Sequence, residues 1–277
     1  MIGISAIIII ATLWYFWKGV YREYILFEER IAHHGSVVQG AAALGGSVLL
    51  DPQQAPPDVR QSIMRGFRII EDTQTYAKQY SGDRLNCKNC HFEGGDTLGG
   101  KNNGISLVGV TTQYPSYSAR FGKMMTLADR INNCFERSMN GTPLPVDSQM
   151  MQDIIAYLSW ISKEVRQYKT IPWLGLARLK SQHTPDPTAG KKVYEIYCAM
   201  CHQRDGSGRI VGSLEDHPPL WGPGSFNNEA GMTRINTLSS FIYWNMPFMD
   251  AGITEDEALD VASYILSKPR PSYSVSP

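Results

Sequence analysis

Apolar residues recur at helical spacing in six segments of the chain. In residues 58–80, Val59, Ile63, Phe67 and Ile70 are three or four positions apart, which places them on one face of an amphipathic helix. Patterns of this kind predict helices at residues 58–80, 126–139, 147–167, 186–201, 232–244 and 254–267. No alternating strand pattern of any length accompanies them in the sequence, so we expect an all-α fold.

The six helices form two sets of three in the same order, which indicates a duplicated small helical unit. The last helix carries a clear start signal, because Thr254 is followed three positions later by Glu257 in a capping-box pattern. Prolines ahead of the first set indicate a tether. We expect a membrane anchor or signal at 1–24, a tether at 25–57, a first domain at 58–167, a linker at 168–185 and a second domain at 186–277.

Charge and cysteine content narrow the classes of function. The chain has 26 basic and 26 acidic residues and a formal net charge of zero, so the composition gives no indication of a nucleic-acid partner. Four of the five cysteines form two CxxC pairs, and a histidine follows each pair directly. These motifs are Cys87, Cys90 and His91, and Cys198, Cys201 and His202.

A CxxCH motif binds haem for a mechanical reason. The two thiols bond to the two vinyl-derived carbons, and the next residue reaches the iron from one face. A zinc site or a redox dithiol is the alternative interpretation of a CxxC pair, but neither requires a histidine directly after both pairs. We therefore expect two covalently bound c-type haems in two tandem cytochrome c-type domains, with His91 and His202 as proximal ligands.

The N-terminus has the character of a membrane element. Residues 2–17 carry no charge, and aromatic residues at 14–17 resemble an interfacial belt. Lys18 and Arg22 follow the apolar run, which by the positive-inside rule would leave the rest of the chain in the cytoplasm. Because c-type haem is attached outside the cytoplasm, we instead expect an anchor in the bacterial inner membrane with the body on the periplasmic side. The alternative is a cleaved secretory signal, with a cleavage site in the Gly/Ala segment at 40–47, and a soluble periplasmic protein.

Each haem iron also needs a ligand on its second face. For the second haem the best candidate is Met246, which follows a predicted helix and is held in an extended loop by Pro247. Met232 and Met249 are the competing residues, and Met246 as a packing residue is the plainer interpretation.

For the first haem the candidate is Cys134, which lies in the predicted helix at 126–139. Arg130 and Arg137 lie close in sequence, and cationic neighbours favour a thiolate. A lone thiol is also a liability in an oxidising compartment. The alternatives are an inert buried thiol and ligation by Met124, Met125 or Met139.

Several short segments resemble the dihaem thiosulfate dehydrogenase/tetrathionate reductase family. The resemblance covers about residues 58–268, and the segments around Cys134 and at 218–222 carry it most specifically. The segments are residues 85–91, 114–117, 130–141, 218–222, 225–227 and 245–247.

The resemblance implies an enzyme that joins two thiosulfates into tetrathionate with release of two electrons, or runs the reverse. His91 and Cys134 would ligate the active-site haem, and Arg120 and Arg130 would hold the anionic substrate. Each arginine has a plainer interpretation as a haem propionate partner or a surface charge. Arg137 and Ser138 are candidates for the pocket lining, with Arg137 the weaker candidate among the arginines.

The second haem, on His202, would relay electrons to an external partner such as a small cytochrome c or another redox protein. Some members of the family have a lysine directly before the methionine ligand and switch between the two. This chain has Asn245 at that position, so the resemblance implies a fixed Met246 ligand.

Three other classes of function remain open at the level of sequence. One is a dihaem electron carrier without a substrate, which gives Cys134 no role. Another is a haem-thiolate enzyme that conjugates thiosulfate to a cysteine of a carrier protein. The third is a membrane-bound subunit of a larger respiratory complex.

Overall fold

The computed structural model describes residues 49–82, 84–100, 102–166, 168, 170–211, 215–249 and 252–274. The expected membrane anchor at residues 1–24 lies outside these ranges, as does most of the expected tether. Within the described ranges, no helix is both long enough and apolar enough to cross a membrane.

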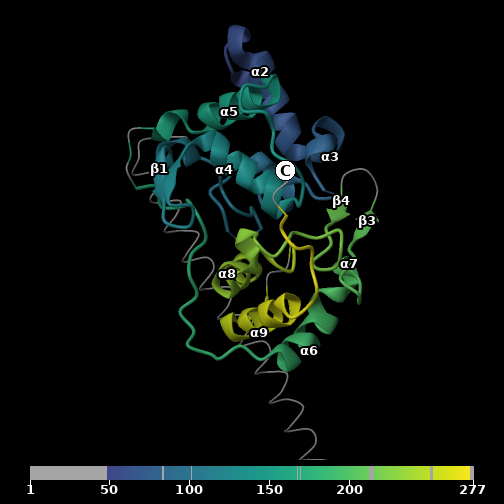
Figure 1. Ribbon diagram of the computed structural model, residues 1–277. Coiled ribbons are helices and arrows are strands. Elements are labelled where there is room, and N and C mark those ends of the chain that lie inside the picture. Colours follow the sequence, from purple (N-terminus) through teal and green to yellow (C-terminus); the bar gives the residue numbers. More distant parts are fainter. Residues whose placement is uncertain are drawn as a thin grey trace, which may run out of the picture.

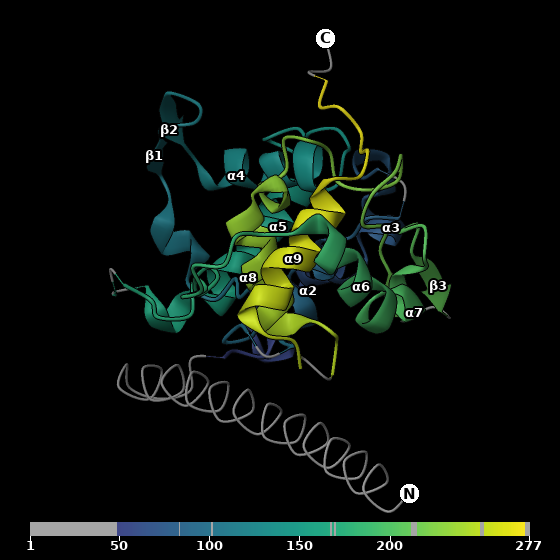
Figure 2. The ribbon, with the colours of Figure 1, turned by 90° about the horizontal axis from the view of Figure 1, so that it is seen from below.

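Two helical units lie one above the other (Figure 1). In the first, α2 packs against α5; in the second, α9 packs against both α6 and α8, and Figure 2 shows α8 and α9 side by side. Each unit has its own apolar core, with Tyr157 at the centre of one and Val261 in the other. The α-helices are α2 (Pro57–Glu71), α3 (Thr73–Tyr76), α4 (Leu127–Asn133), α5 (Gln149–Ile161), α6 (Pro187–Tyr197), α7 (Ala199–His202), α8 (Ile235–Asn245) and α9 (Glu255–Leu266).

The expected helical fold is confirmed, with two small additions. Each unit carries one antiparallel hairpin of three-residue strands, too short to produce a sequence signal. The strands are β1 (Ser116–Ser118) with β2 (Lys123–Met125), and β3 (Arg209–Val211) with β4 (Glu215–His217). The short 3₁₀ turns are η1 (Pro52–Gln54), η2 (Lys78–Tyr80), η3 (Cys87–Asn89), η4 (Phe92–Gly95), η5 (Val110–Gln113), η7 (Lys163–Val165) and η8 (Gly231–Thr233), and η6 (Cys134–Ser138) is a π-helix.

The first and last helices of each unit cross at a glycine. A Cβ placed on Gly66 of α2 would lie 2.0 Å from the Asp153 carbonyl oxygen of α5, and one on Gly190 of α6 would lie 1.9 Å from the Asp260 carbonyl oxygen of α9. The helices can approach this closely only because neither glycine has a side chain. The same crossing in both units confirms that the helical unit is duplicated.

The predicted helices exist but some are shorter than expected. The helix expected at 58–80 ends at Glu71, because the Asp72 side chain accepts a hydrogen bond from the Thr75 amide and starts the separate helix α3. The capping box of Thr254 and Glu257 at the start of α9 is confirmed.

Several polar contacts hold the two units together. Nδ2 of the Asn227 side chain donates to the Glu136 carbonyl oxygen at 2.8 Å and to Asn140 Oδ1 at 3.0 Å. The chain after α9 runs back to the first unit (Figure 1), where the Tyr273 hydroxyl donates to Glu136 Oε1 at 3.1 Å. The segment after Cys134 is therefore fixed from the second unit.

Candidate active site and haem-binding residues

The His91 imidazole is oriented by the main chain of the following loop. Its Nδ1 lies 2.8 Å from the Ile105 carbonyl oxygen. Because that oxygen only accepts, Nδ1 carries the proton and the Nε2 lone pair is left to bind a metal. Burial, with a smaller contribution from the Arg130 guanidinium, lowers the pKa of the imidazole to about 4. A neutral imidazole with one free nitrogen is what an iron ligand requires.

His202 repeats this arrangement in the second unit. Its Nδ1 lies 2.9 Å from the Pro218 carbonyl oxygen, and burial lowers the pKa of its imidazole. The two motif histidines therefore present Nε2 in the same way, although the carbonyl partner of His91 is 14 residues on and that of His202 is 16 residues on.

The motif thiols have the opposite character from a redox dithiol. Burial raises the pKa of Cys87, Cys90 and Cys198 to about 12. A dithiol catalyst needs a thiolate near neutral pH, so these thiols do not suit a redox dithiol. The five cysteines form no disulfide.

Cys134 lies beside a cation. Nη1 of Arg130 donates a hydrogen bond to Cys134 Sγ at 2.8 Å. The Cys134 sulfur raises the pKa of the guanidinium, and the Tyr114 hydroxyl acts in the same direction. Burial raises the pKa of Tyr114 itself, against the effect of Arg130. Sulfur, guanidinium and phenol therefore form one cluster on the first unit.

The helix that carries this cluster changes its winding at Cys134. α4 ends at Asn133, and the Met139 amide bonds to the Cys134 carbonyl oxygen at 2.9 Å, five residues back, as in a π-helix. Such widened turns are frequent at functional sites. The continuous helix predicted at 126–139 is therefore wrong at this point.

Arg120 makes different contacts from Arg130. It donates to the Glu229 carbonyl oxygen at 3.0 Å and forms an ion pair with the Glu229 carboxylate, across the boundary between the units. Arg137 packs over the rings of Phe121 and Tyr273, at 4.9 and 4.3 Å from their centroids. The structure therefore brings Arg130 to Cys134 and ties Arg120 to the second unit.

The candidate methionines differ in exposure. Met246 follows α8 and packs against the second core, whereas Met249 is 82% exposed and Met232 is buried in that core. In the first unit, Met139 is buried, with Sδ 3.9 Å from Cys87 Sγ. Ligation by Met246 and by Cys134 remains a prediction.

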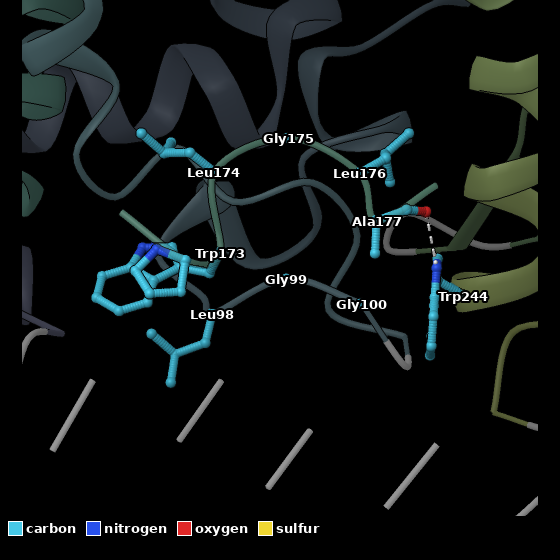
Figure 3. Close-up of a pocket in the computed structure, with 10 residues that line it drawn as sticks. Leu98, Gly99, Gly100, Trp173, Leu174, Gly175, Leu176, Ala177 and Trp244 are labelled. Carbon is cyan, nitrogen blue, oxygen red and sulfur yellow. Dashed lines mark hydrogen bonds between the residues drawn. The ribbon is translucent and has the colours of Figure 1, made fainter. Parts of the chain in front are cut away.

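A small hollow lies where the units meet, apart from the Cys134 cluster. It encloses about 110 Å³ between Gly99 and Gly100, the segment 172–177, and Trp244 at the end of α8. Figure 3 shows the Trp244 indole donating to the Ala177 carbonyl oxygen, at 3.0 Å. Its wall is nearly all apolar or glycine, and it contains none of the candidate site residues.

Comparison with known proteins decides the family. Residues 73–166 match the SoxA/TsdA cytochrome c domain, and residues 185–265 match cytochrome c oxidase, cbb3-type, subunit III. Thiosulfate dehydrogenase of Allochromatium vinosum is 39% identical over 215 residues, which are 77% of this chain and 80% of that protein. Thiosulfate dehydrogenase of Stutzerimonas stutzeri is 39% identical over 211 residues, 76% of this chain and 67% of that protein.

This chain belongs to the thiosulfate dehydrogenase family. The family suggested by the sequence motifs is confirmed. The fold agrees with the structure of thiosulfate dehydrogenase (TsdBA) from Marichromatium purpuratum, at a TM-score of 0.75 and 28% identity over 83% of this chain. The chain covers 51% of the length of that larger chain.

As a member of the thiosulfate dehydrogenase family, the chain has two cytochrome c domains and carries two covalently bound c-type haems. The free Nε2 of both motif histidines fits that cofactor. Nothing in the sequence indicated the contacts made by the Tyr114 hydroxyl and by the carbonyl groups of Ile105 and Pro218. Main-chain partners such as these leave no local sequence signal, whereas the four-residue spacing of Arg130 and Cys134 was a signal for their contact.

Proposed function

We propose that this chain interconverts two thiosulfates and one tetrathionate, with transfer of two electrons, at a site built around Cys134. Membership of the thiosulfate dehydrogenase family supports the reaction class. The observation that carries the proposal is the hydrogen bond of 2.8 Å from Arg130 Nη1 to Cys134 Sγ. This contact places the sulfur of Cys134 beside a guanidinium that can bind an anion.

Arg130 is proposed to bind the substrate. Thiosulfate is a dianion with three terminal oxygens, and a guanidinium offers a planar fork of donors that matches two of them. The Tyr114 hydroxyl, in the same cluster, supplies a further donor. Arg120 is proposed as a second cation for the substrate, which would compete with Glu229 for the guanidinium.

Cys134 is proposed to carry a sulfur adduct. A Cys134 thiolate released from the iron would join the terminal sulfur of one thiosulfate in a new S–S bond. The two electrons that this step releases would pass to the two oxidised haems, one each. The terminal sulfur of a second thiosulfate then attacks the substrate-derived sulfur of that bond, as in thiol–disulfide exchange. Tetrathionate leaves and Cys134 returns to the thiolate, so that two thiosulfates give one tetrathionate and two electrons.

The ligand assignments are part of the proposal. His91 and Cys134 would hold the first haem iron, and His202 and Met246 the second. Each haem supplies one-electron redox chemistry when bound. The protein fixes the orientation of each proximal histidine through the Ile105 and Pro218 carbonyl groups.

Electrons are proposed to leave through an exposed apolar surface beside the second motif. This surface, the exit patch, consists of Ile196, Tyr197, Met200 and Ile210, of which Met200 is 79% exposed. The exposed charged residues next to it in sequence are mainly basic, with Lys191, Lys192, Arg204 and Arg209 against Glu195 and Asp205. Lys191 pairs with Glu195. An acidic redox protein such as a small cytochrome c fits such a surface.

The body of the protein is proposed to lie on the periplasmic side of the inner membrane, with residues 1–24 as its anchor and 58–167 and 186–277 as its two domains. The uncharged run at residues 2–17 supports the anchor. Covalent haem attachment supports the location outside the cytoplasm.

Tetrathionate formation tests this function. The haem-loaded full chain is mixed with thiosulfate and ferricyanide, with Cys134→Gly in parallel and the haem content of both measured. We expect activity in the wild type and its loss in the variant with both haems retained. Wild-type protein that neither forms nor reduces tetrathionate would instead favour an electron carrier or a conjugating enzyme.

A further inference from the structure

Asn245 occupies an unusual place at the junction of the two units. It is the last residue of α8, directly precedes Met246, and is completely buried. Its Oδ1 accepts a hydrogen bond from the Gly104 amide of the first unit at 2.9 Å, and its Nδ2 donates to the Phe241 carbonyl oxygen at 3.2 Å. Both ends of the side-chain amide are thus engaged, one in each unit.

The segment that Asn245 contacts is the one that orients His91. Gly104 is followed by Ile105, whose carbonyl oxygen accepts the hydrogen bond from His91 Nδ1 at 2.8 Å. The Ile105 amide in turn bonds to the Cys90 carbonyl oxygen at 2.9 Å. Gly104 has φ +67°, and a Cβ there would lie 2.6 Å from that same Cys90 oxygen, so the segment lies tightly against the first haem motif.

Two further contacts join the same two loops. The Asn102 side chain donates to the Asn245 carbonyl oxygen at 2.9 Å. Phe92, the residue after His91, packs edge-on against Phe241 and Phe248, with ring centroids 6.0 and 5.4 Å apart. Phe241 and Phe248 lie on either side of Met246 in sequence. The sequence neighbours of His91 and of Met246, the two candidate iron ligands, therefore pack against each other.

We propose that Asn245 is a positioning residue that couples the two haem sites. Through its main chain it fixes the loop of Met246, and through Gly104 and Ile105 it fixes the imidazole of His91. The hydrogen bond on Nδ1 sets the orientation and basicity of an imidazole ligand, so a change at Asn245 alters the ligand field of both irons. The inference rests on the proposed ligands His91 and Met246, and is independent of the substrate.

Two variants test the coupling in the haem-loaded full chain. Asn245→Leu removes the acceptor of the Gly104 amide and the donor to Phe241. Asn102→Gly removes the side-chain bonds to the carbonyl oxygens of Asn245 and Pro247, at 2.9 and 3.4 Å. Glycine also suits the positive φ of Asn102, +78°. The matched control is Asn103→Gly, because the neighbouring Asn103 side chain bonds to Glu93 Oε1 of the first unit at 2.8 Å and to no described residue of the second unit.

The readouts are the methionine-to-iron charge-transfer band of the second haem and the low-temperature EPR signal of the first. We expect the band to weaken or vanish and the EPR signal to shift in both variants, more in Asn245→Leu, with neither change in the control. If Asn245→Leu does not fold, Asn102→Gly decides the question alone. A change confined to the second haem would overturn the coupling, and a wild type without the methionine band would overturn the ligand assignment on which it rests.

Discussion

Arg130 and Cys134 lie one helical turn apart, and Nη1 of the arginine donates a hydrogen bond to Sγ of the cysteine at 2.8 Å. Residues four apart on a helix share a face. The α-helix that carries Arg130 ends one residue before Cys134, where the π-helix begins. The second unit holds the far end of this segment through Asn227, which bonds to the Glu136 carbonyl oxygen. The candidate site thus belongs to the first unit but is fixed by both.

Arg130 is predicted to bind thiosulfate. Replacing it in Arg130→Gln removes the charge-assisted hydrogen bonds proposed for thiosulfate, each of which contributes about 1.5–3 kcal/mol. We expect kcat/KM for thiosulfate to fall roughly ten- to hundredfold, as measured by steady-state ferricyanide reduction. Arg234→Gln, at an exposed position in the second unit, is the control. An equal change in kcat/KM in both variants would contradict the role of Arg130.

Arg120 is predicted to be shared between Glu229 and the substrate. Glu229→Gln removes the competing anion, so KM for thiosulfate should fall by a few-fold, consistent with about 0.2–1 kcal/mol for an exposed ion pair. Arg120→Gln should raise KM. If both variants keep the wild-type KM, Arg120 serves only to join the units.

The two helix crossings make a prediction about stability. Alanine at Gly66 or Gly190 places a methyl group against a main-chain carbonyl oxygen at 2.0 or 1.9 Å. We expect each variant to lower the free energy of unfolding by about 1–3 kcal/mol or more, measured by urea denaturation of the haem-loaded protein. Gly231→Ala is the control, since its Cβ would meet no atom within 4 Å. If Gly66→Ala had the urea midpoint of the wild type, the close contact between the two helices at Gly66 would be contradicted.

Stability should also depend on pH through Asp96. Burial raises the pKa of this carboxyl to about 7, and no described residue donates to its Oδ1. The folded chain therefore keeps the proton up to about pH 7, whereas the unfolded chain loses it near about pH 4. The stabilisation is complete below about pH 4 and is lost as the pH rises to about 7.

Asp96→Asn tests this dependence, because the amide stays neutral at every pH. We expect the variant to lose most of the decline in unfolding free energy between pH 5 and pH 8 and to exceed the wild type at pH 8. Asp147→Asn, at an exposed position, should keep the wild-type slope. An unchanged slope in Asp96→Asn would show that other groups cause the decline.

A change in the exit patch is predicted to slow electron transfer to a protein acceptor but not to ferricyanide. Ile196 is 69% exposed, and a charge at this position in Ile196→Glu disfavours burial against a protein partner. We expect kcat/KM for a small cytochrome c to fall about tenfold, equivalent to about 1.4 kcal/mol, while ferricyanide reduction is unchanged. Val146→Glu, with Val146 64% exposed in the first unit, is the control, and equal losses in both variants would move the docking site elsewhere.

Local sequence patterns predicted some features of this molecule better than others. The CxxCH motifs, the six helical segments and the capping box at Thr254 depend on residues close in sequence, and all three are present in the structure. The π-helix at Cys134 lies instead among contacts between distant segments. The Thr142 amide bonds to the Tyr80 carbonyl oxygen, and the Asn227 side chain bonds to the Glu136 carbonyl oxygen. The bond between Asn245 and Gly104 spans 141 residues, a separation at which periodicity carries no information.

The mass of the Cys134 peptide tests most directly whether Cys134 carries a covalent sulfur adduct. The oxidised, haem-loaded full chain is mixed with one equivalent of thiosulfate, quenched in acid without reductant, digested and analysed by mass spectrometry, with Cys134→Gly as the control. We expect this peptide to gain the mass of one thiosulfate, and a second equivalent of thiosulfate to remove that mass as tetrathionate appears. Active enzyme that forms tetrathionate while the Cys134 peptide stays unmodified at every quench time would contradict it.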